Sequence, residues 1–211
     1  MDKEVLELFQ EDWGEPTQRI EADEAVLAQL APSVPPLLIN YWRHLGFSVF
    51  KDGLMSLCNP LEWKPLIDEW LKGTELEQLD VFIPIMRGVC GEFELFGINY
   101  GFTPKLITLY SGYVGSREIP KVSLETTTKG VFMTQPKHFL PATDPDDFMQ
   151  VFHRHAPFGP QEMLGYVPAL PLGGSRDYAK LQKVDAFAYL SMLRQITGEL
   201  KGVMEYADIY K

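Results

Sequence analysis

The middle of the chain limits the possible folds most, because two segments rich in Phe, Ile, Val and Tyr follow each other with only glycine turns between their apolar runs. They read DVFIPIMRGVCGEFELFGINYG (residues 80–101) and PKLITLYSGYVG (residues 104–115). This composition is typical of β-strands. Parallel neighbours need a crossover connection of a dozen or more residues, and these turns are too short to supply one. The sequence therefore predicts an antiparallel sheet at the centre of the molecule.

Amphipathic helical patterns precede this central segment. In each of them apolar residues recur at spacings of three and four, and the pattern ends at a glycine or a proline. Asp23 is placed to cap the second pattern, and Asn59-Pro60 opens the fourth. Between the third and the fourth, an Asp52-Gly53 pair joins two short apolar runs and predicts a hairpin. The predicted helices cover residues 2–14, 24–32, 34–46 and 60–73, and the hairpin covers residues 47–60.

The C-terminal part of the chain has two further helical patterns separated by irregular stretches. Residues 121–143 have the least regular pattern, and we expect a seam between two halves there. Asp144-Pro145 starts one helix, which runs out near Pro157, and Asp185 caps another that ends at Gly198. The tail that follows is predicted to add one strand or helical turn. The predicted fold is α+β, with N-terminal helices, a central antiparallel sheet and C-terminal helices packed on it.

The charge of the chain is concentrated at its beginning. The net charge is -10, and residues 1–30 hold nine acidic and two basic side chains, whereas the other 181 residues hold 20 and 17. Such an acidic segment repels nucleic acid and attracts basic surfaces. Its acidic, amphipathic start does not resemble a secretory signal, and no apolar run is long enough to span a membrane. We therefore predict a cytoplasmic protein that binds neither nucleic acid nor membranes.

The stretch LGYVPALPLGG (residues 164–174) combines an apolar run with two prolines and a glycine pair. It is not a phosphate-binding loop, because Gly173-Gly174 is followed by Ser175-Arg176 and no lysine stands at the required position. Pro168 and Pro171 are incompatible with a central strand. We expect a rigid, edge-like segment that turns sharply at the glycine pair.

No constellation of residues in the sequence requires an enzyme. The chain has neither a G-x-S-x-G nucleophile elbow nor an H-E-x-x-H helix. His153 and His155 lie two residues apart, so a continuing helix would direct them to different faces and away from a shared metal ion. Cys58 and Cys90 are isolated from each other, and no C-x-x-C pattern occurs. We predict no catalytic residue, metal or cofactor.

Two longer motifs carry a resemblance to known families. VPPLLINYWRHLGFSVFKDGLMSLCNPLEWKPLIDEWL (34–71) resembles the GAD-like domain, with its proline-led helix, Tyr-Trp pair, hairpin and Asn-Pro helix. FGPQEMLGYVPALPLGGSRDYAKLQKVDAFAYLSMLRQITG (158–198) is similar to the C-terminal domain of immunity proteins that act against type VI secretion DNase effectors. GVCGEFELFGINYG (88–101) resembles the strand pair between them. Residues 121–138 and the tail after Gly198 match neither pattern.

The resemblance implies a GAD-like domain over residues 1–105 and an immunity-protein domain over residues 106–211, with their seam inside residues 120–142. It also implies that the chain binds and neutralises a cognate toxin, most simply a DNase effector with a basic surface, by direct protein–protein contact. Charge complementarity would speed that association. Six residues are predicted to face the toxin: Glu21, Asp23, Glu24, Gly173, Gly174 and Arg176.

Two other classes of function stay open from the sequence. The same fold would serve a cytosolic regulatory or scaffold protein that binds a housekeeping partner. A small-molecule-binding domain or enzyme would need a pocket, for which Phe93, Phe96 and Tyr100 are the candidate lining, although the core is the favoured place for these aromatics. The sequence leaves the oligomeric state open.

Overall fold

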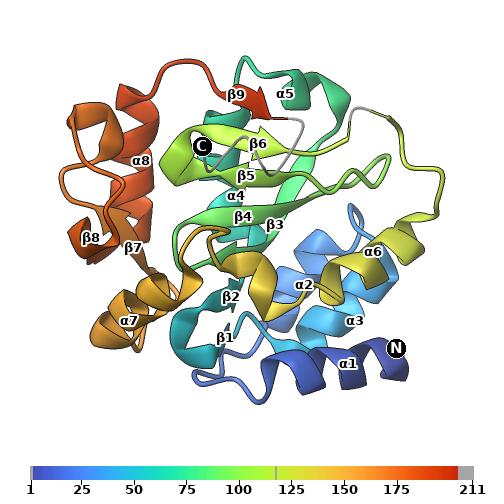
Figure 1. The fold of residues 1–211 in the computed structure, drawn as a ribbon. Coiled ribbons are helices and arrows are strands. Elements are labelled where there is room, and N and C mark those ends of the chain that lie inside the picture. The colour runs from blue at the N-terminus through green and yellow to red at the C-terminus, as the bar shows by residue number, and fades with distance from the viewer. Residues whose placement is uncertain (1, 117, 204–211) are drawn as a thin grey trace.

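The computed structural model describes residues 2–116 and 118–203, and a seven-stranded sheet lies at the centre of this part of the chain (Figure 1). The strand order is β1-β2-β3-β4-β5-β6-β9. Neighbours from β1 to β6 pair antiparallel, as the short turns predicted, whereas β9 joins the edge of β6 in parallel. The strands are β1 (Val49–Phe50), β2 (Met55–Leu57), β3 (Phe82–Gly88), β4 (Glu92–Gly97), β5 (Lys105–Ile107), β6 (Gly112–Val114) and β9 (Lys201–Val203).

The predicted N-terminal helices are confirmed with their caps. The Asp2 side chain accepts a hydrogen bond from the backbone of the first helix, and the Asp23 and Asn59 side chains do the same for the second and fourth. The hairpin of β1 and β2 turns through a short 3₁₀ segment that contains Asp52-Gly53. The helices are α1 (Lys3–Trp13), α2 (Glu24–Leu30), α3 (Pro36–Leu45) and α4 (Pro60–Leu71), followed by the short α5 (Glu75–Leu79), which the sequence pattern did not reveal.

The expectation of an irregular stretch over residues 121–143 was wrong. Residues Leu124–Phe132 form helix α6, which the Ser123 side chain caps by accepting from the backbone N–H of Thr126, and a 3₁₀ turn follows at Pro136–Phe139. Helix α6 packs against α1 and α3. Phe132 is fully buried against Tyr41, with ring centroids 4.5 Å apart. Tertiary packing therefore stabilises this helix, although its local sequence pattern does not indicate one.

The C-terminal elements form a second, smaller unit beside the sheet. Helices α7 and α8 agree with the prediction, and Asp185 caps α8 as expected. Between them, two strands that the sequence pattern did not reveal as a pair form an antiparallel hairpin. The predicted tail strand is present as β9, while residues 204–211 lie outside the described part of the chain. These elements are α7 (Pro145–His155), β7 (Glu162–Tyr166), β8 (Leu181–Asp185) and α8 (Ala186–Ile196).

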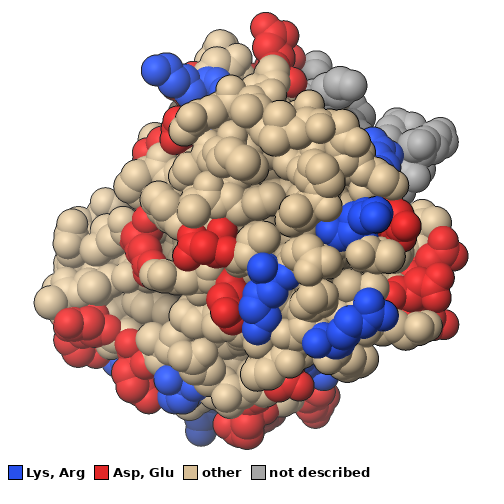
Figure 2. Space-filling view, turned by 90° about the vertical axis from the view of Figure 1, so that its left-hand side faces the viewer, with Lys and Arg blue, Asp and Glu red and all other residues tan. Residues whose placement is uncertain are grey.

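One continuous apolar core connects the sheet to both sets of helices. Helix α4 packs on β3 and also contacts α8, and the backbone N–H of Leu164 in β7 donates to the carbonyl oxygen of Val89 at 2.7 Å. In Figure 1, α7, β7, β8 and α8 lie together on one flank of the sheet. Figure 2 views that flank: charged side chains are sparse over its upper part and gather below it. Within the described residues, no helix is both long and apolar enough to cross a membrane.

Candidate functional site

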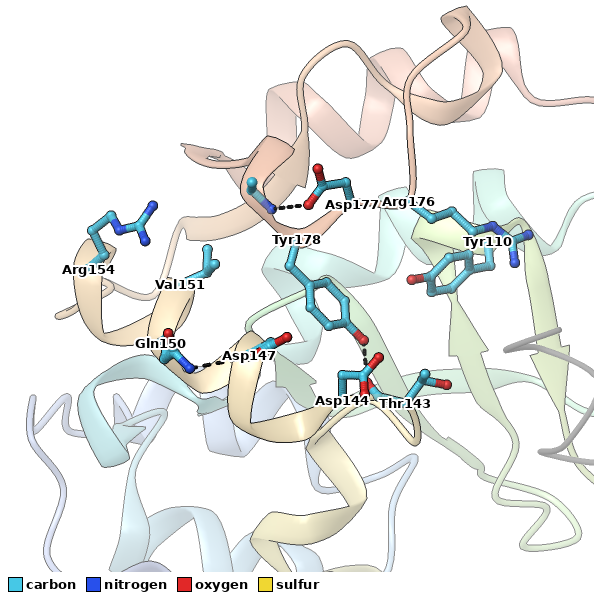
Figure 3. Close-up of a pocket in the computed structure, with 11 residues that line it drawn as sticks. Tyr110, Thr143, Asp144, Asp147, Gln150, Val151, Arg154, Arg176, Asp177 and Tyr178 are labelled. Atoms are coloured by element: carbon cyan, nitrogen blue, oxygen red, sulfur yellow. Dashed lines mark hydrogen bonds between the residues drawn. The ribbon is translucent and has the colours of Figure 1, made fainter.

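A surface cleft of about 540 Å³ opens between helix α7 and the segment that joins β7 to β8 (Figure 3). Its walls carry three aspartates, two arginines and two tyrosines. The α7 side contributes Asp144, Asp147 and Arg154, and the opposite side contributes Arg176, Asp177 and Tyr178, with Tyr110 from the sheet beside them. The cleft thus combines charged and aromatic groups from three distant parts of the chain.

Local hydrogen bonds fix the two walls. Asp177 caps the 3₁₀ turn Tyr178–Lys180 by accepting from the backbone N–H of Ala179 at 2.9 Å. The Tyr178 hydroxyl donates to the carbonyl oxygen of Thr143 at 2.6 Å, and Figure 3 shows this side chain reaching across the cleft toward the start of α7. The Tyr178 ring also meets Phe148 of α7 edge to face, with centroids 5.7 Å apart. Tyr178 therefore ties the β7–β8 connection to α7.

A second tyrosine contact anchors Arg176. Its guanidinium lies 5.0 Å from the centre of the Tyr110 ring, a cation–π geometry. The hydroxyls of Tyr110 and Tyr166 are 3.2 Å apart, and the Tyr166 hydroxyl also approaches the carbonyl oxygen of Arg176 at 3.3 Å. Burial raises the pKa of Tyr110, of Tyr166 and of Tyr178, the last to about 12, so all three hydroxyls stay protonated at neutral pH.

The side chains that line the cleft are mostly polar, and they include no His, Cys or Ser. Asp147 accepts a hydrogen bond from the side chain of Gln150 at 3.3 Å, and Asp177 serves as a cap. In the described part of the chain, no group of three or more His, Cys, Asp or Glu side chains could hold a metal ion.

Of the six residues predicted to face a partner, Arg176 lines the cleft. Gly173 and Gly174 stand three and two residues before it in the chain and are not among the residues that line the cleft. Strand β7 ends at Tyr166, and the prolines that follow lie outside any strand, in agreement with the edge-like segment expected there. Gly173 has φ +84°, the left-handed conformation that ends the 3₁₀ turn Leu170–Leu172.

The other three predicted residues lie elsewhere and are engaged with their neighbours. The Glu21 carboxylate is 2.8 Å from the guanidinium of Arg19, and the Glu24 carboxylate is 2.7 Å from that of Arg43. These ion pairs lower the pKa of both glutamates. Asp23 accepts from the first turn of α2, and together with Glu21 it lines a separate hollow of about 260 Å³. The structure does not join these acids to the cleft.

Sequence reasoning missed most of the cleft. Asp147, Tyr110, Asp177 and Tyr178 were not among the predicted site residues. One local signal was available: Arg176-Asp177 is the first charged pair after the uncharged stretch VPALPLGGS. The aromatics considered as a pocket lining do not form one, because Phe93 and Phe96 are fully buried in the core while Tyr100 is half exposed.

Comparisons with known proteins give the context for this site. Residues 4–110 match the family model of the GAD-like domain, and residues 133–197 match the model of the C-terminal part of the type VI secretion (T6SS) immunity protein Tdi1. The chain is also similar to a protein of known structure, Atu4351 from Agrobacterium tumefaciens, with a TM-score of 0.82 and 18% sequence identity over 94% of this chain and 93% of that one. At that identity the similarity shows a shared fold. No curated protein matches the chain.

Proposed function

We propose that this chain, which belongs to the GAD-like family by its match over residues 4–110, binds and neutralises a cognate DNase effector, because its residues 133–197 match the model of the C-terminal part of the T6SS immunity protein Tdi1. The observation that carries the proposal is the presence of both family matches in one chain, in this order. We propose that inhibition takes place by direct contact in the cytoplasm and that the chain itself is not an enzyme.

The surface chemistry supports a basic partner. The chain carries a net charge of -10, concentrated in residues 1–30, and the cleft, in the part of the chain that matches the immunity family, holds three aspartates and two arginines. A nuclease needs a basic surface to hold DNA phosphates. An acidic protein that occupies such a surface competes with DNA and is drawn to it by charge.

We further propose that the chain has two domains, a GAD-like domain formed by residues 1–105 and an immunity-protein domain formed by residues 106–211. The second of these carries the cleft and the Gly173-Gly174 turn. The continuous core that joins the two parts would then hold the cleft in a fixed position for the partner.

Co-expression tests the proposal. The toxin encoded beside this chain's gene would be induced in a bacterial host with and without the chain, while survival and the integrity of genomic DNA are followed. We expect death and DNA degradation without the chain, and survival with intact DNA when it is present. Purification of a tagged chain should recover the toxin in a stable complex.

An unrelated acidic protein of similar size serves as the control for non-specific charge effects. If cells die with degraded DNA despite abundant folded chain, and no complex forms, then neutralisation of this toxin is wrong. A regulatory or scaffold role would be favoured instead if the tagged chain recovered a housekeeping protein under the same conditions. Strong thermal stabilisation by a single metabolite would favour the small-molecule alternative.

A further inference from the structure

Helix α8 exposes a face without charge, which is unusual for a helix at the surface. The helix reads AFAYLSMLRQI, and its single charged residue is Arg194. That guanidinium donates at 3.0 Å to the carbonyl oxygen of Glu69 in α4, so it is directed away from the exposed face. Exposed apolar residues remain at Phe187, Met192 and Ile196. Helices that face water normally carry charged side chains there.

The segment after β7 continues this uncharged surface. Residues 167–175, VPALPLGGS, hold no charged side chain, and Val167 and Leu172 are 49% and 58% exposed. The Tyr189 hydroxyl of α8 donates to the carbonyl oxygen of Tyr166, the residue directly before this segment, at 2.8 Å. Met192 and Ile196 follow Tyr189 by three and seven residues, so they lie on the side of the helix that contacts the end of β7, where the segment begins.

We infer that this combined surface is the docking site for the effector. We call it the apolar face and define it by Val167, Leu172, Met192 and Ile196. Figure 2 shows an uncharged area in the upper part of this flank, with charged side chains at its margins. Contiguous exposed apolar patches of this kind mark protein-interaction sites. The inference rests on the proposed function, because it locates the contact that neutralisation requires.

The border of the apolar face identifies the chemistry of the partner. Arg176 and Asp177 follow the segment directly and lead into the cleft, whose three aspartates outnumber its two arginines. An apolar centre with a polar rim is the usual anatomy of a protein–protein interface. The partner that fits is a protein surface with an apolar patch bordered by basic side chains, as expected of a DNA-binding effector.

A second copy of this chain fits the apolar face less well. In a two-fold dimer the same patch meets itself, so the aspartates at its border would lie near their own copies. Each chain also carries a net charge of -10, which opposes self-association. The charge of the border therefore favours a basic partner over a homodimer.

Arginine substitutions on the apolar face give a direct test. Leu172→Arg and Met192→Arg place a charge in the centre of the surface at exposed positions, where folding should be little affected. Ile119→Arg is the matched control, because Ile119 is 60% exposed, comparable to Leu172 at 58%, and lies outside the apolar face. Each variant of the full chain would be titrated against an inactive form of the toxin encoded by the neighbouring gene, with urea unfolding as the check on folding.

We expect Leu172→Arg and Met192→Arg to weaken binding by about 30-fold or more, and Ile119→Arg to change it by less than about threefold. If both variants bind as tightly as the unchanged chain, the location is wrong while neutralisation stands. If the unchanged chain neither binds nor protects, the proposed function and this inference fail together. A dimer of the unchanged chain that Leu172→Arg dissociates, seen by sedimentation, would assign the apolar face to self-association and overturn the effector as its occupant.

Discussion

The glycine pair Gly173-Gly174 offers a matched test of how the β7–β8 connection holds its shape. Gly173 has a positive φ, but a Cβ added there would stand in open space. Gly174 has the opposite constraint, since an added Cβ would overlap the carbonyl oxygen of Pro168 and come within 2.9 Å of the backbone of Ala169. Alanine at the first position thus tests conformation alone, and alanine at the second tests close packing against backbone.

The two costs can be worked out separately. A left-handed conformation destabilises an L-residue by about 1–2 kcal/mol. Alanine also reduces the conformational entropy of the unfolded chain, which offsets part of this cost, so Gly173→Ala should lower the free energy of unfolding by about 1 kcal/mol. Backbone atoms cannot move aside singly. Gly174→Ala must therefore disrupt the hydrogen bonds that Gly174 and Leu172 donate to Ala169, at 3.1 and 2.9 Å. At about 1 kcal/mol for each bond plus the strain of overpacking, its cost should be about 2–3 kcal/mol.

Urea unfolding followed by tryptophan fluorescence would measure both variants, because Trp13, Trp42 and Trp70 are fully buried and report loss of the core. Gly173→Asn is the control, since Asn tolerates the left-handed region and should cost less than Ala there. The order of stability should be wild type, Gly173→Asn, Gly173→Ala, Gly174→Ala. A Gly174→Ala protein as stable as Gly173→Ala would refute the steric argument and show that the connection rearranges freely.

Two further predictions concern carboxylates of the central sheet. Burial raises the pKa of Glu92 above its ordinary value of 4.5, so the folded state binds this proton more tightly than the unfolded state, and stability falls as pH rises above 4.5. Glu92→Gln should flatten this fall in thermal melts recorded at a series of pH values. An unchanged dependence of Tm on pH would exclude this carboxyl as its source. Asp80 is 8% exposed and accepts from the backbone N–H groups of Asn99 and Tyr100, both at 2.9 Å. Asp80→Ala should lower the free energy of unfolding by about 3 kcal/mol and Tm by about 6–12 °C. The control Asp68→Ala removes an exposed ion pair and should lower the free energy of unfolding by less than about 1 kcal/mol. Equal shifts in Tm would contradict the assigned role of Asp80.

The elements that the sequence predicted are those with local signals. Asp185 accepts from the backbone N–H of Ala188 at 2.7 Å, as a cap should, and the Asp52-Gly53 turn lies where the hairpin was expected. Helix α6 lacked such a signal because its sequence LETTTKGVF contains three threonines and a glycine, which are poor helix formers. It is held by contacts between distant residues, including the ion pair of Lys129 with Asp2 at 2.9 Å.

The cleft was only partly predictable for the same reason. Arg176 could be singled out because it follows an uncharged run, but its ring partner Tyr110 lies 66 residues earlier in the chain. Tyr166 meets Tyr110 across 56 residues, and Tyr178 meets Thr143 across 35. No spacing rule connects such pairs, since the sheet and the β7–β8 hairpin bring them together only after folding.

Arg87 explains how the C-terminal elements are held firmly enough to present a binding surface. This guanidinium is 2% exposed, and its Nη2 donates to the carbonyl oxygens of Pro160 and Glu162 at 2.9 and 3.0 Å. It also lies 5.2 Å from the centre of the Trp63 ring on α4. The Nε of this guanidinium is buried without a hydrogen-bond partner, so losing the two carbonyl acceptors as well would be costly, and they hold the start of β7 in place. Because that strand leads into the apolar face, the surface is positioned before a partner arrives, and less freedom is lost on binding.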